Sequence, residues 1–94
     1  MVVEVTVCRI KKSCEEKAQR VCDEVHAFVV SQPGCVRCFE KKSLQDPQLW
    51  MLYSEFRTEE AYKAYLSAAS ERDRQAGKPP LEGLAEEVFR EAFA

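Results

Sequence analysis

Residues 49–66 are the stretch that most constrains how this chain can fold. The segment Leu49 to Phe56 holds eight residues rich in aromatic and aliphatic side chains, with neither Gly nor Pro, which predicts a central strand covered on both faces. Thr58 then offers a hydroxyl to cap a helix, and the two glutamates that follow suit the positive end of that helix. Apolar side chains recur behind the cap at helical spacing: Tyr62, Leu66 and Ala69, flanked by Ala61, Tyr65 and Ala68. The stretch therefore predicts a buried strand that leads directly into a helix.

A strand, a helix and a second strand are predicted before this stretch. The first strand alternates between two faces, with Val3, Val5 and Val7 on one and Val2, Glu4, Thr6, Cys8 and Ile10 on the other. Ser13 and Glu16 have the spacing of a capping box, so we expect them to start a helix that ends at Gln32-Pro33-Gly34. A shorter strand is predicted at 36–42, followed by a hairpin loop at 44–47.

The last stretch of the chain fits two structures. Apolar residues between Leu81 and Phe93 match a helix of period 3.6, and periodicity alone favours a helix there. The order strand, helix, strand, strand, helix, however, leaves a place for a final strand that pairs with the first. We therefore predict a strand over Glu87–Phe93 and keep helix as the alternative for residues 84–94. The whole chain, residues 1–94, is then a single α+β domain of ferredoxin-like βαββαβ order with a four-stranded antiparallel sheet.

Composition excludes several classes of partner. Fourteen Lys and Arg against sixteen Asp and Glu give a net charge of −2 without a basic block, which argues against nucleic acid. Apolar runs such as Ala27 to Val30 are far too short to span a membrane. The N-terminal run contains Glu4 and no small-residue cleavage site, so it does not resemble a signal peptide. Five cysteines without a regular framework suit reduced thiols, and we predict a cytoplasmic protein.

The predicted sheet has more apolar surface than two helices can cover. In the 49–56 strand, Leu49, Met51, Tyr53 and Glu55 point opposite to Trp50, Leu52, Ser54 and Phe56. Both faces of the sheet therefore carry large apolar groups, and the face without helices needs a partner. A face-to-face homodimer is the simplest solution, because a two-fold axis buries the same patch on both copies.

Two motifs resemble the antibiotic biosynthesis monooxygenase domain. One is the turn Gln32-Pro33-Gly34-Cys35 after an amphipathic helix, and the other is the Asp46-Pro47 loop followed by LYSEFRTEEAYKAYL over residues 52–66. The resemblance implies ferredoxin-like subunits paired into a dimeric α/β barrel. It also implies a small cofactor-independent monooxygenase that acts on an aromatic or enolisable metabolite and needs no cofactor. The alternative is a non-catalytic domain of the same fold that binds a small ligand or only oligomerises.

Individual positions both match and depart from that family. Tyr62 matches a tyrosine that oxygenase members place in their pocket, which makes it the candidate catalytic residue. Phe56 stands where a tryptophan is usual, and Leu52 stands where oxygenase members carry an asparagine. The histidine common near Tyr65 is missing, which counts against the haem-degrading activity of other members.

The aromatic side chains suggest where a substrate would bind. A flat ligand would suit a cavity lined by aromatic residues with phenols as hydrogen-bond donors. The candidate substrate-binding residues are Trp50, Leu52, Ser54, Phe56 and Tyr65. The alternative is that these side chains only fill the core and a dimer interface.

The cysteines and the single histidine give little support for a metal site. Cys35 and Cys38 are three apart on a predicted strand, which places them on opposite faces. Cys14 and Cys22 are separated by about 12 Å along a helix axis. His26 lies beside the apolar stripe of the first helix and is interpreted as a solvent-facing residue. We therefore predict no metal.

Overall fold

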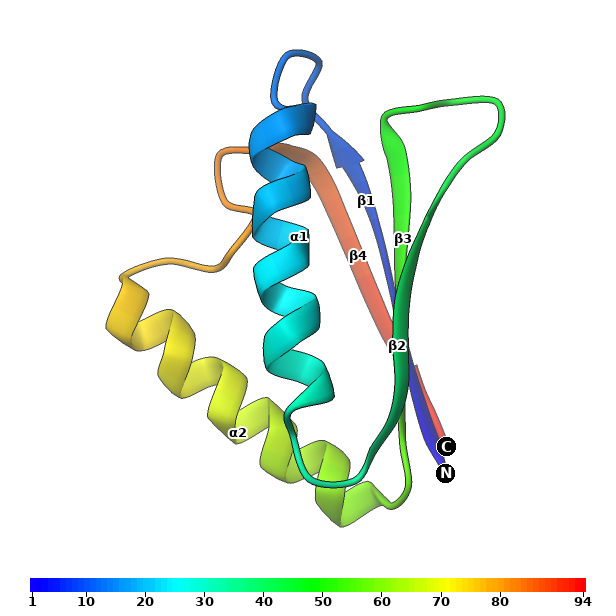
Figure 1. Cartoon of the computed structure of the whole chain (residues 1–94), viewed down its shortest axis with the longest axis vertical. Helices are drawn as coiled ribbons and strands as arrows, with labels where there is room; N and C mark the ends of the chain where they lie inside the picture. Colours follow the sequence, from blue (N-terminus) through cyan, green and yellow to red (C-terminus); the bar gives the residue numbers. More distant parts are fainter.

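The computed structural model describes all 94 residues and has the predicted order of elements (Figure 1). These elements are β1 (Val2–Ile10), α1 (Glu15–Val30), β2 (Cys35–Lys42), β3 (Leu49–Phe56), α2 (Glu59–Ala76) and β4 (Ala85–Phe93). The strands form one antiparallel sheet in the order β2-β3-β1-β4, so that β3 and β1 are central. The predicted ferredoxin-like α+β fold is confirmed.

The final strand is confirmed, and the helix alternative for residues 84–94 is wrong. β4 pairs antiparallel with β1, with Val7 opposite Phe89 and Thr6 opposite Arg90. The helical period of this segment misleads because it ignores the free edge of β1, whose backbone groups find partners in β4.

Helix capping follows the sequence at one helix and departs from it at the other. Thr58 caps α2 as predicted, and its Oγ1 accepts a hydrogen bond from the Ala61 N–H at 3.1 Å. The capping box predicted at Ser13 is wrong, because Cys14 occupies the N-cap of α1 without a side-chain bond. Ser13 instead takes a left-handed turn conformation with φ +86°, and its N–H donates to the Glu15 carboxylate. Neither helix is both long and apolar enough to cross a membrane.

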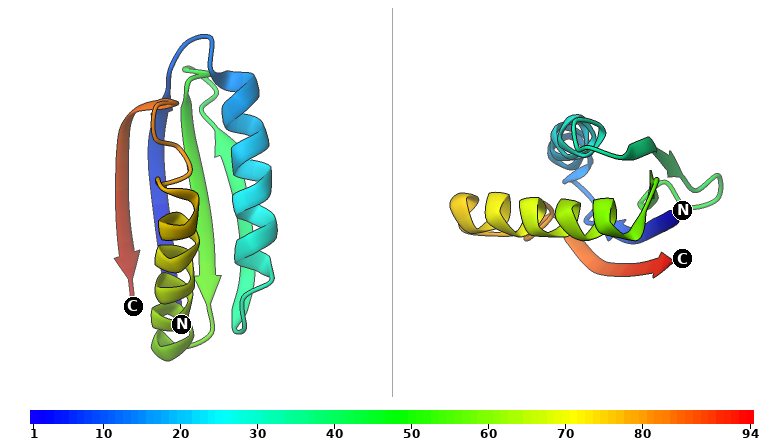
Figure 2. Two further views of the ribbon diagram at one scale, coloured as in Figure 1. Left: turned by 90° about the vertical axis from the view of Figure 1, so that its left-hand side faces the viewer. Right: turned by 90° about the horizontal axis from the view of Figure 1, so that it is seen from below.

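Both helices lie on one side of the sheet, but they contact it differently (Figures 1 and 2). α1 packs along the sheet and buries Ala18 and Cys22 against Ile10 and Trp50. α2 begins beside the end of β3 and runs away from the sheet, and none of its residues is fully buried. The divergence of α2 leaves space between the helices and the sheet.

Aromatic rings hold the first turns of α2 against the sheet. The ring of Phe56 stacks on Tyr65 with centroids 4.8 Å apart and lies 5.7 Å from Tyr62. Phe28 of α1 approaches Tyr65 at 6.4 Å, so the same cluster joins the two helices. The N-terminal half of α2 is thereby fixed by packing.

Gly34 permits the close approach of the α1–β2 turn to α2. Its φ is +84°, and its carbonyl accepts a hydrogen bond from the Arg57 N–H at 2.8 Å. A Cβ at this position would lie 2.6 Å from the Cβ of Ala61, closer than two carbon atoms can pack. The turn therefore sets the position at which α2 starts.

We predict that Gly34→Ala destabilises the fold by about 2–4 kcal/mol, because it adds overpacking to an unfavourable left-handed backbone. Urea unfolding measures the change. Gly83→Ala is the matched control, since Gly83 has the same positive φ, +83°, but nothing within 4 Å of an added Cβ. Equal losses in the two variants would show that contact with Ala61 is not the cause.

Candidate active site

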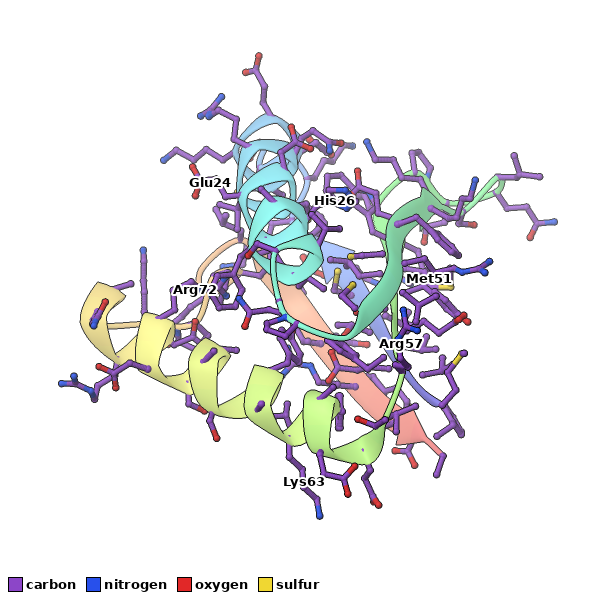
Figure 3. The ribbon with its side chains drawn as sticks, turned by 60° about the horizontal axis from the view of Figure 1, so that its bottom comes forward. Glu24, His26, Met51, Arg57, Lys63 and Arg72 are labelled. Carbon is purple, nitrogen blue, oxygen red and sulfur yellow. The ribbon has the colours of Figure 1, made fainter.

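A cavity of about 750 Å³ lies between the two helices and the sheet. Its walls come from the helix-facing side of the sheet, from α1 and α2, and from the segment 79–83 that leads into β4. Arg72 extends from α2 toward α1 at this opening, whereas Lys63 points away from the body of the protein (Figure 3). The volume falls in the range that suits a small organic ligand.

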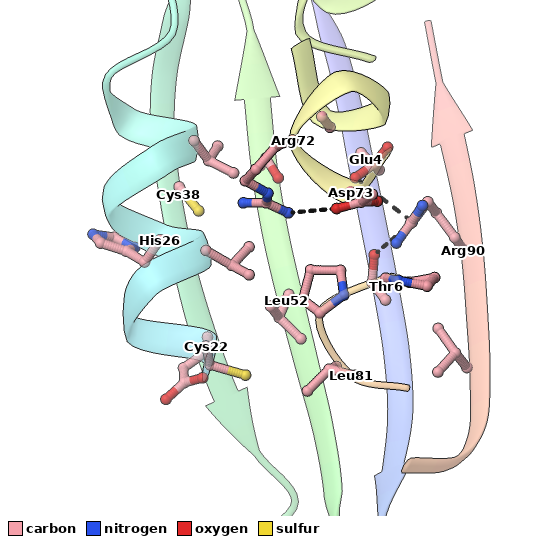
Figure 4. Close-up of a pocket in the computed structure, with 18 of the residues that line it drawn as sticks. Glu4, Thr6, Cys22, His26, Cys38, Leu52, Arg72, Asp73, Leu81 and Arg90 are labelled. Carbon is pink, nitrogen blue, oxygen red and sulfur yellow. Dashed lines mark hydrogen bonds and ion pairs between the residues drawn. The ribbon is translucent and has the colours of Figure 1, made fainter. Parts of the chain in front are cut away.

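The floor of the cavity is polar at its centre because of the register of the strands. Glu4 and Thr6 occupy neighbouring inward positions of β1. Glu4 lies opposite Ser54 of β3, and Thr6 lies between Leu52 of β3 and Arg90 of β4. Side chains directly opposite each other in a sheet point to the same face, so these residues form one surface (Figure 4).

Glu4 is the central polar group of this floor and is only 4% exposed. Its Oε2 accepts a hydrogen bond of 2.6 Å from the Tyr62 hydroxyl. Its Oε1 faces the Arg90 Nε at 4.0 Å, and that Nε donates to the Thr6 Oγ1 at 3.4 Å. A buried carboxylate is thus held by one phenol and one guanidinium, with Oε1 left beyond hydrogen-bond distance of the arginine.

Two phenols near Glu4 remain protonated at neutral pH. Burial, together with the hydrogen bond to Glu4, raises the pKa of Tyr62 well above its ordinary value. Burial and the charge of Glu4 raise the pKa of Tyr65 to about 12. Both side chains therefore act as hydrogen-bond donors and not as bases.

Two thiols and the Glu40 carboxylate of β2 also line the cavity. Burial, with a contribution from the charge of Glu40, raises the pKa of Cys22 to about 12. Burial likewise raises the pKa of Cys38 to about 11, so both remain neutral thiols. Glu40 accepts from Gln19 Nε2 at 2.6 Å through Oε1, while its buried Oε2 has no partner. All five cysteines are free, and nowhere do three His, Cys, Asp or Glu side chains gather as metal ligands would.

The prediction that Cys35 and Cys38 point to opposite faces is wrong. A register shift between Cys35 and Arg37 pairs Cys35 with Phe56 and Cys38 with Ser54. Both partners face the helices, so the bulge turns both thiols to the same side of the sheet. The simple alternation of an undistorted strand fails at this irregularity.

The predicted site residues divide into three groups. Leu52, Ser54 and Tyr65 line the cavity. Trp50 and Phe56 are 1% and 0% exposed and pack in the core, where they support the cavity from outside its wall. Tyr62 is not part of the wall and reaches the cavity through its hydrogen bond to Glu4. The exposed His26 lies on the wall contributed by α1.

Sequence reasoning missed the charged residues of the site. Glu4 had a visible signal, because two consecutive inward positions of an otherwise apolar strand, Glu4 and Thr6, are polar. No sequence pattern pointed to Arg90, because its position in the site depends on the pairing of β4 with β1. Arg72 lies over the ring of Phe28, with its guanidinium carbon 4.4 Å from the ring centroid, and joins α2 to α1 beside the cavity.

Comparison with known proteins places this chain in a family. A family model described as antibiotic biosynthesis monooxygenase matches residues 1–76, which excludes β4. The chain belongs to the antibiotic biosynthesis monooxygenase family. The match includes the strand and helix that carry Glu4 and Tyr62. A search of curated proteins found no match.

Several solved structures of the family share the fold. A variant of SnoaB, a cofactor-independent oxygenase from Streptomyces nogalater, aligns with a TM-score of 0.82 at 16% identity over 99% of this chain and 90% of that one. A protein of Nitrosomonas europaea, provisionally described as an antibiotic biosynthesis monooxygenase, aligns with a TM-score of 0.82 at 18% identity. The alignment covers 100% of this chain and 97% of that one. A protein of Deinococcus radiodurans with the same provisional description aligns with a TM-score of 0.84 at 12% identity. The alignment covers 100% of this chain and 91% of that one. At these identities the likeness establishes the fold alone.

We predict that stability begins to fall as the pH rises above about 9, because folded Cys22 and Cys38 keep protons that the unfolded thiols lose. The decline should steepen above about 10, the ordinary pKa of a tyrosine. The unfolded chain loses its phenol protons near that pH, whereas folded Tyr53, Tyr62 and Tyr65 retain theirs because their pKa values are raised. The unfolded state is then favoured with increasing pH. Urea unfolding between pH 8 and 11, with phenolate absorbance as a second signal, measures the effect. Tyr62→Phe should show a weaker decline, and tyrosines that titrate normally in the folded protein would contradict the prediction.

Proposed function

We propose that this protein is a cofactor-independent monooxygenase that acts on a small aromatic or enolisable compound. The observation that carries the proposal is the open cavity with a buried carboxylate, Glu4, next to Tyr62. A domain used only for oligomerisation would be expected to fill this space with its own side chains, as protein interiors normally do. Membership of the family and the likeness to SnoaB support the same reaction class.

The proposed reaction uses the electrons of the substrate. Removal of an acidic proton from a substrate CH₂ group leaves a carbanion or enolate, which attacks dioxygen at that carbon. The resulting hydroperoxide loses water to give a carbonyl group. One oxygen atom enters the product, and the other leaves as water with the two hydrogens of the original carbon. The protein must bind the ring, accept a proton and shield the anion from water.

The residues of the cavity suit these tasks. Leu52 and Tyr65 offer apolar surface for a flat ring, and Ser54 offers a hydroxyl beside Glu4. Trp50 and Phe56 hold the surrounding wall rigid from the core. Tyr62 acts as a positioning residue, because its hydrogen bond fixes one oxygen of Glu4. Tyr62 thus serves the reaction through the carboxylate and not by touching the substrate.

We predict that Tyr62→Phe lowers kcat by about 10–100-fold with little change in KM, because it loosens a group that acts only during the reaction. A thermal-shift screen of polycyclic phenols and enolisable ketones identifies a ligand, and oxygen uptake with that ligand measures turnover. Tyr53→Phe is the matched control, since Tyr53 donates to Glu55 at 2.7 Å on the opposite face of the sheet. Equal turnover by Tyr62→Phe and the parent would remove this role. Ligand binding without oxygen uptake would favour the non-catalytic alternative.

We also propose a homodimer formed by the sheet face without helices. Most of its central residues are apolar: Val3, Val5, Val7, Phe39, Met51, Tyr53, Phe89 and Phe93. The charged exceptions are Glu91, opposite Val5, and Glu55, opposite Val3. Val7 lies between Met51 and Phe89, and Val3 lies beside Phe93, so the apolar groups are continuous across three strands. Phe89 and Phe93 are 64% and 55% exposed in the single chain. Exposure of large apolar side chains to water is unfavourable, and a contiguous patch of them marks an interaction surface. A second copy of the same face matches this patch through a two-fold axis.

We predict that light scattering at micromolar concentration gives a mass twice the 10.8 kDa of the chain. The Phe89→Lys variant should have the mass of a single chain. Phe89 is exposed, so the charge should break the dimer without unfolding the subunit. Trp50 and Phe56 are unsuitable for this test because they pack under the helices. Leu44→Lys, at a fully exposed position of the β2–β3 loop, is the control that should stay dimeric. A monomeric parent protein would refute the proposed dimer.

A further inference from the structure

We propose that Glu4 is the general base of this site, acting through Oε1, and that Arg90 receives the negative charge that forms on the substrate oxygen. This inference rests on the proposed function, because it names the groups that perform its first step. That step is the transfer of a proton from carbon to the carboxylate. Neither residue was a candidate on sequence grounds.

The two oxygens of Glu4 are not equivalent. Oε2 is occupied by the short hydrogen bond from Tyr62. Oε1 faces the guanidinium of Arg90 at 4.0 Å, which leaves it with a lone pair that no donor occupies at hydrogen-bond distance. Glu4 belongs to the cavity wall, so a ligand carrying an acidic hydrogen can take up that lone pair. The geometry thus assigns Oε1 as the proton acceptor.

Arg90 lies where the negative charge would move. The C–H bond of the substrate breaks, its proton goes to Oε1, and its electron pair delocalises onto the neighbouring carbonyl oxygen as an enolate. Glu4 becomes neutral at the same moment, and Arg90 exchanges one anion for another. Glu4 is buried, and Arg90 stands beside it although its own side chain is 59% exposed. The pair therefore faces one negative charge before and after the step, and no additional charge is created beside the buried carboxylate.

The position of Arg90 is fixed by β4. Its Nε donates to the Thr6 hydroxyl at 3.4 Å, which orients the guanidinium toward the floor of the cavity (Figure 4). Arg90 lies outside the residues that the family model matches. A guanidinium from the last strand is thus the proposed partner of the oxyanion.

Other groups of the cavity are poorer bases. Tyr62, Tyr65, Cys22 and Cys38 all keep their protons at neutral pH, because burial raises their pKa values. Four other carboxylates line the cavity: Asp23, Glu40, Asp73 and Glu82. Asp23 and Glu82 are exposed, and Asp73 is already paired with Arg72 at 3.3 Å. Glu40 lies on the edge strand β2 and pairs with no cation. An anion left on the substrate near Glu40 would have no partner comparable to Arg90.

The test separates proton transfer from oxygenation by working without oxygen. The probe is 2-tetralone, a flat bicyclic ketone whose benzylic α-hydrogens exchange with D₂O through an enolate. Loss of their proton NMR signal is followed anaerobically with and without protein. The parent should accelerate exchange above the buffer rate. Glu4→Gln, which can still accept from Tyr62, should lower that acceleration by about 100-fold or more. Arg90→Gln should lower it by about tenfold or more, and Arg90→Lys should restore part of the loss.

The control is a second carboxylate with the same type of surroundings. Glu55 is buried, accepts from Tyr53 at 2.7 Å and faces Arg37 at 3.5 Å, but it lies on the opposite face of the sheet. Glu55→Gln should keep the exchange rate of the parent. Circular dichroism confirms the fold of each variant. If Glu4→Gln does not fold, Glu4→Asp, which retains the charge but withdraws it by one methylene, should show a reduced but measurable rate.

The possible outcomes distinguish the base from the overall reaction. Exchange that depends on Glu4 without any oxygen uptake in air would support the base and refute the monooxygenase. Oxygen uptake that Glu4→Gln leaves unchanged would refute the base and keep the monooxygenase. The inference is also overturned if the parent does not accelerate exchange, or if Glu40→Gln abolishes it while Glu4→Gln does not.

Discussion

The hydrogen bond between Tyr62 and Glu4 is the interaction on which the arrangement of this protein depends. It joins the first strand to the second helix across 58 positions of the chain and lies beside the aromatic cluster around Phe56. A carboxylate that is almost wholly buried needs such a partner, because an unpaired charge there would be costly. The same bond fixes the beginning of α2. Beyond it, α2 departs from the sheet and the cavity opens.

Each face of the sheet carries one buried glutamate with similar partners. Glu4 toward the helices and Glu55 on the open face each accept from a phenol and each face an arginine from a neighbouring edge strand. The surroundings differ, because Glu4 borders a cavity whereas Glu55 lies beside the apolar open face. Similar chemistry can therefore serve a reaction on one side and stability on the other. The proposed site and the proposed dimer interface share one sheet but use opposite faces.

The family supplies the fold, and the individual residues alter the chemistry placed on it. Leu52 lies on the floor of the cavity, whereas Phe56 packs in the core outside its wall. Leu52 gives the floor apolar surface, and the central charges of the floor come from Glu4 of β1 and Arg90 of β4. Arg90 is an example. It belongs to the edge strand β4, but its long side chain extends to the middle of the cavity floor, where it donates a hydrogen bond to the Thr6 hydroxyl.

Local pattern determined much of this protein by itself. The buried strand at 49–56, the Thr58 cap and the alternation of β1 follow from side-chain chemistry and spacing within a few residues, and the chain order then pointed to the final strand. Tertiary structure decided the rest. The bulge that turns Cys35 and Cys38 to one face and the N-cap at Cys14 depend on pairing and turn geometry that no local pattern records. Distant segments of the chain must pack together before Glu4, Tyr62 and Arg90 can meet. The reactivity of a carboxylate depends on its burial and on the charged groups beside it, and only the tertiary structure sets these.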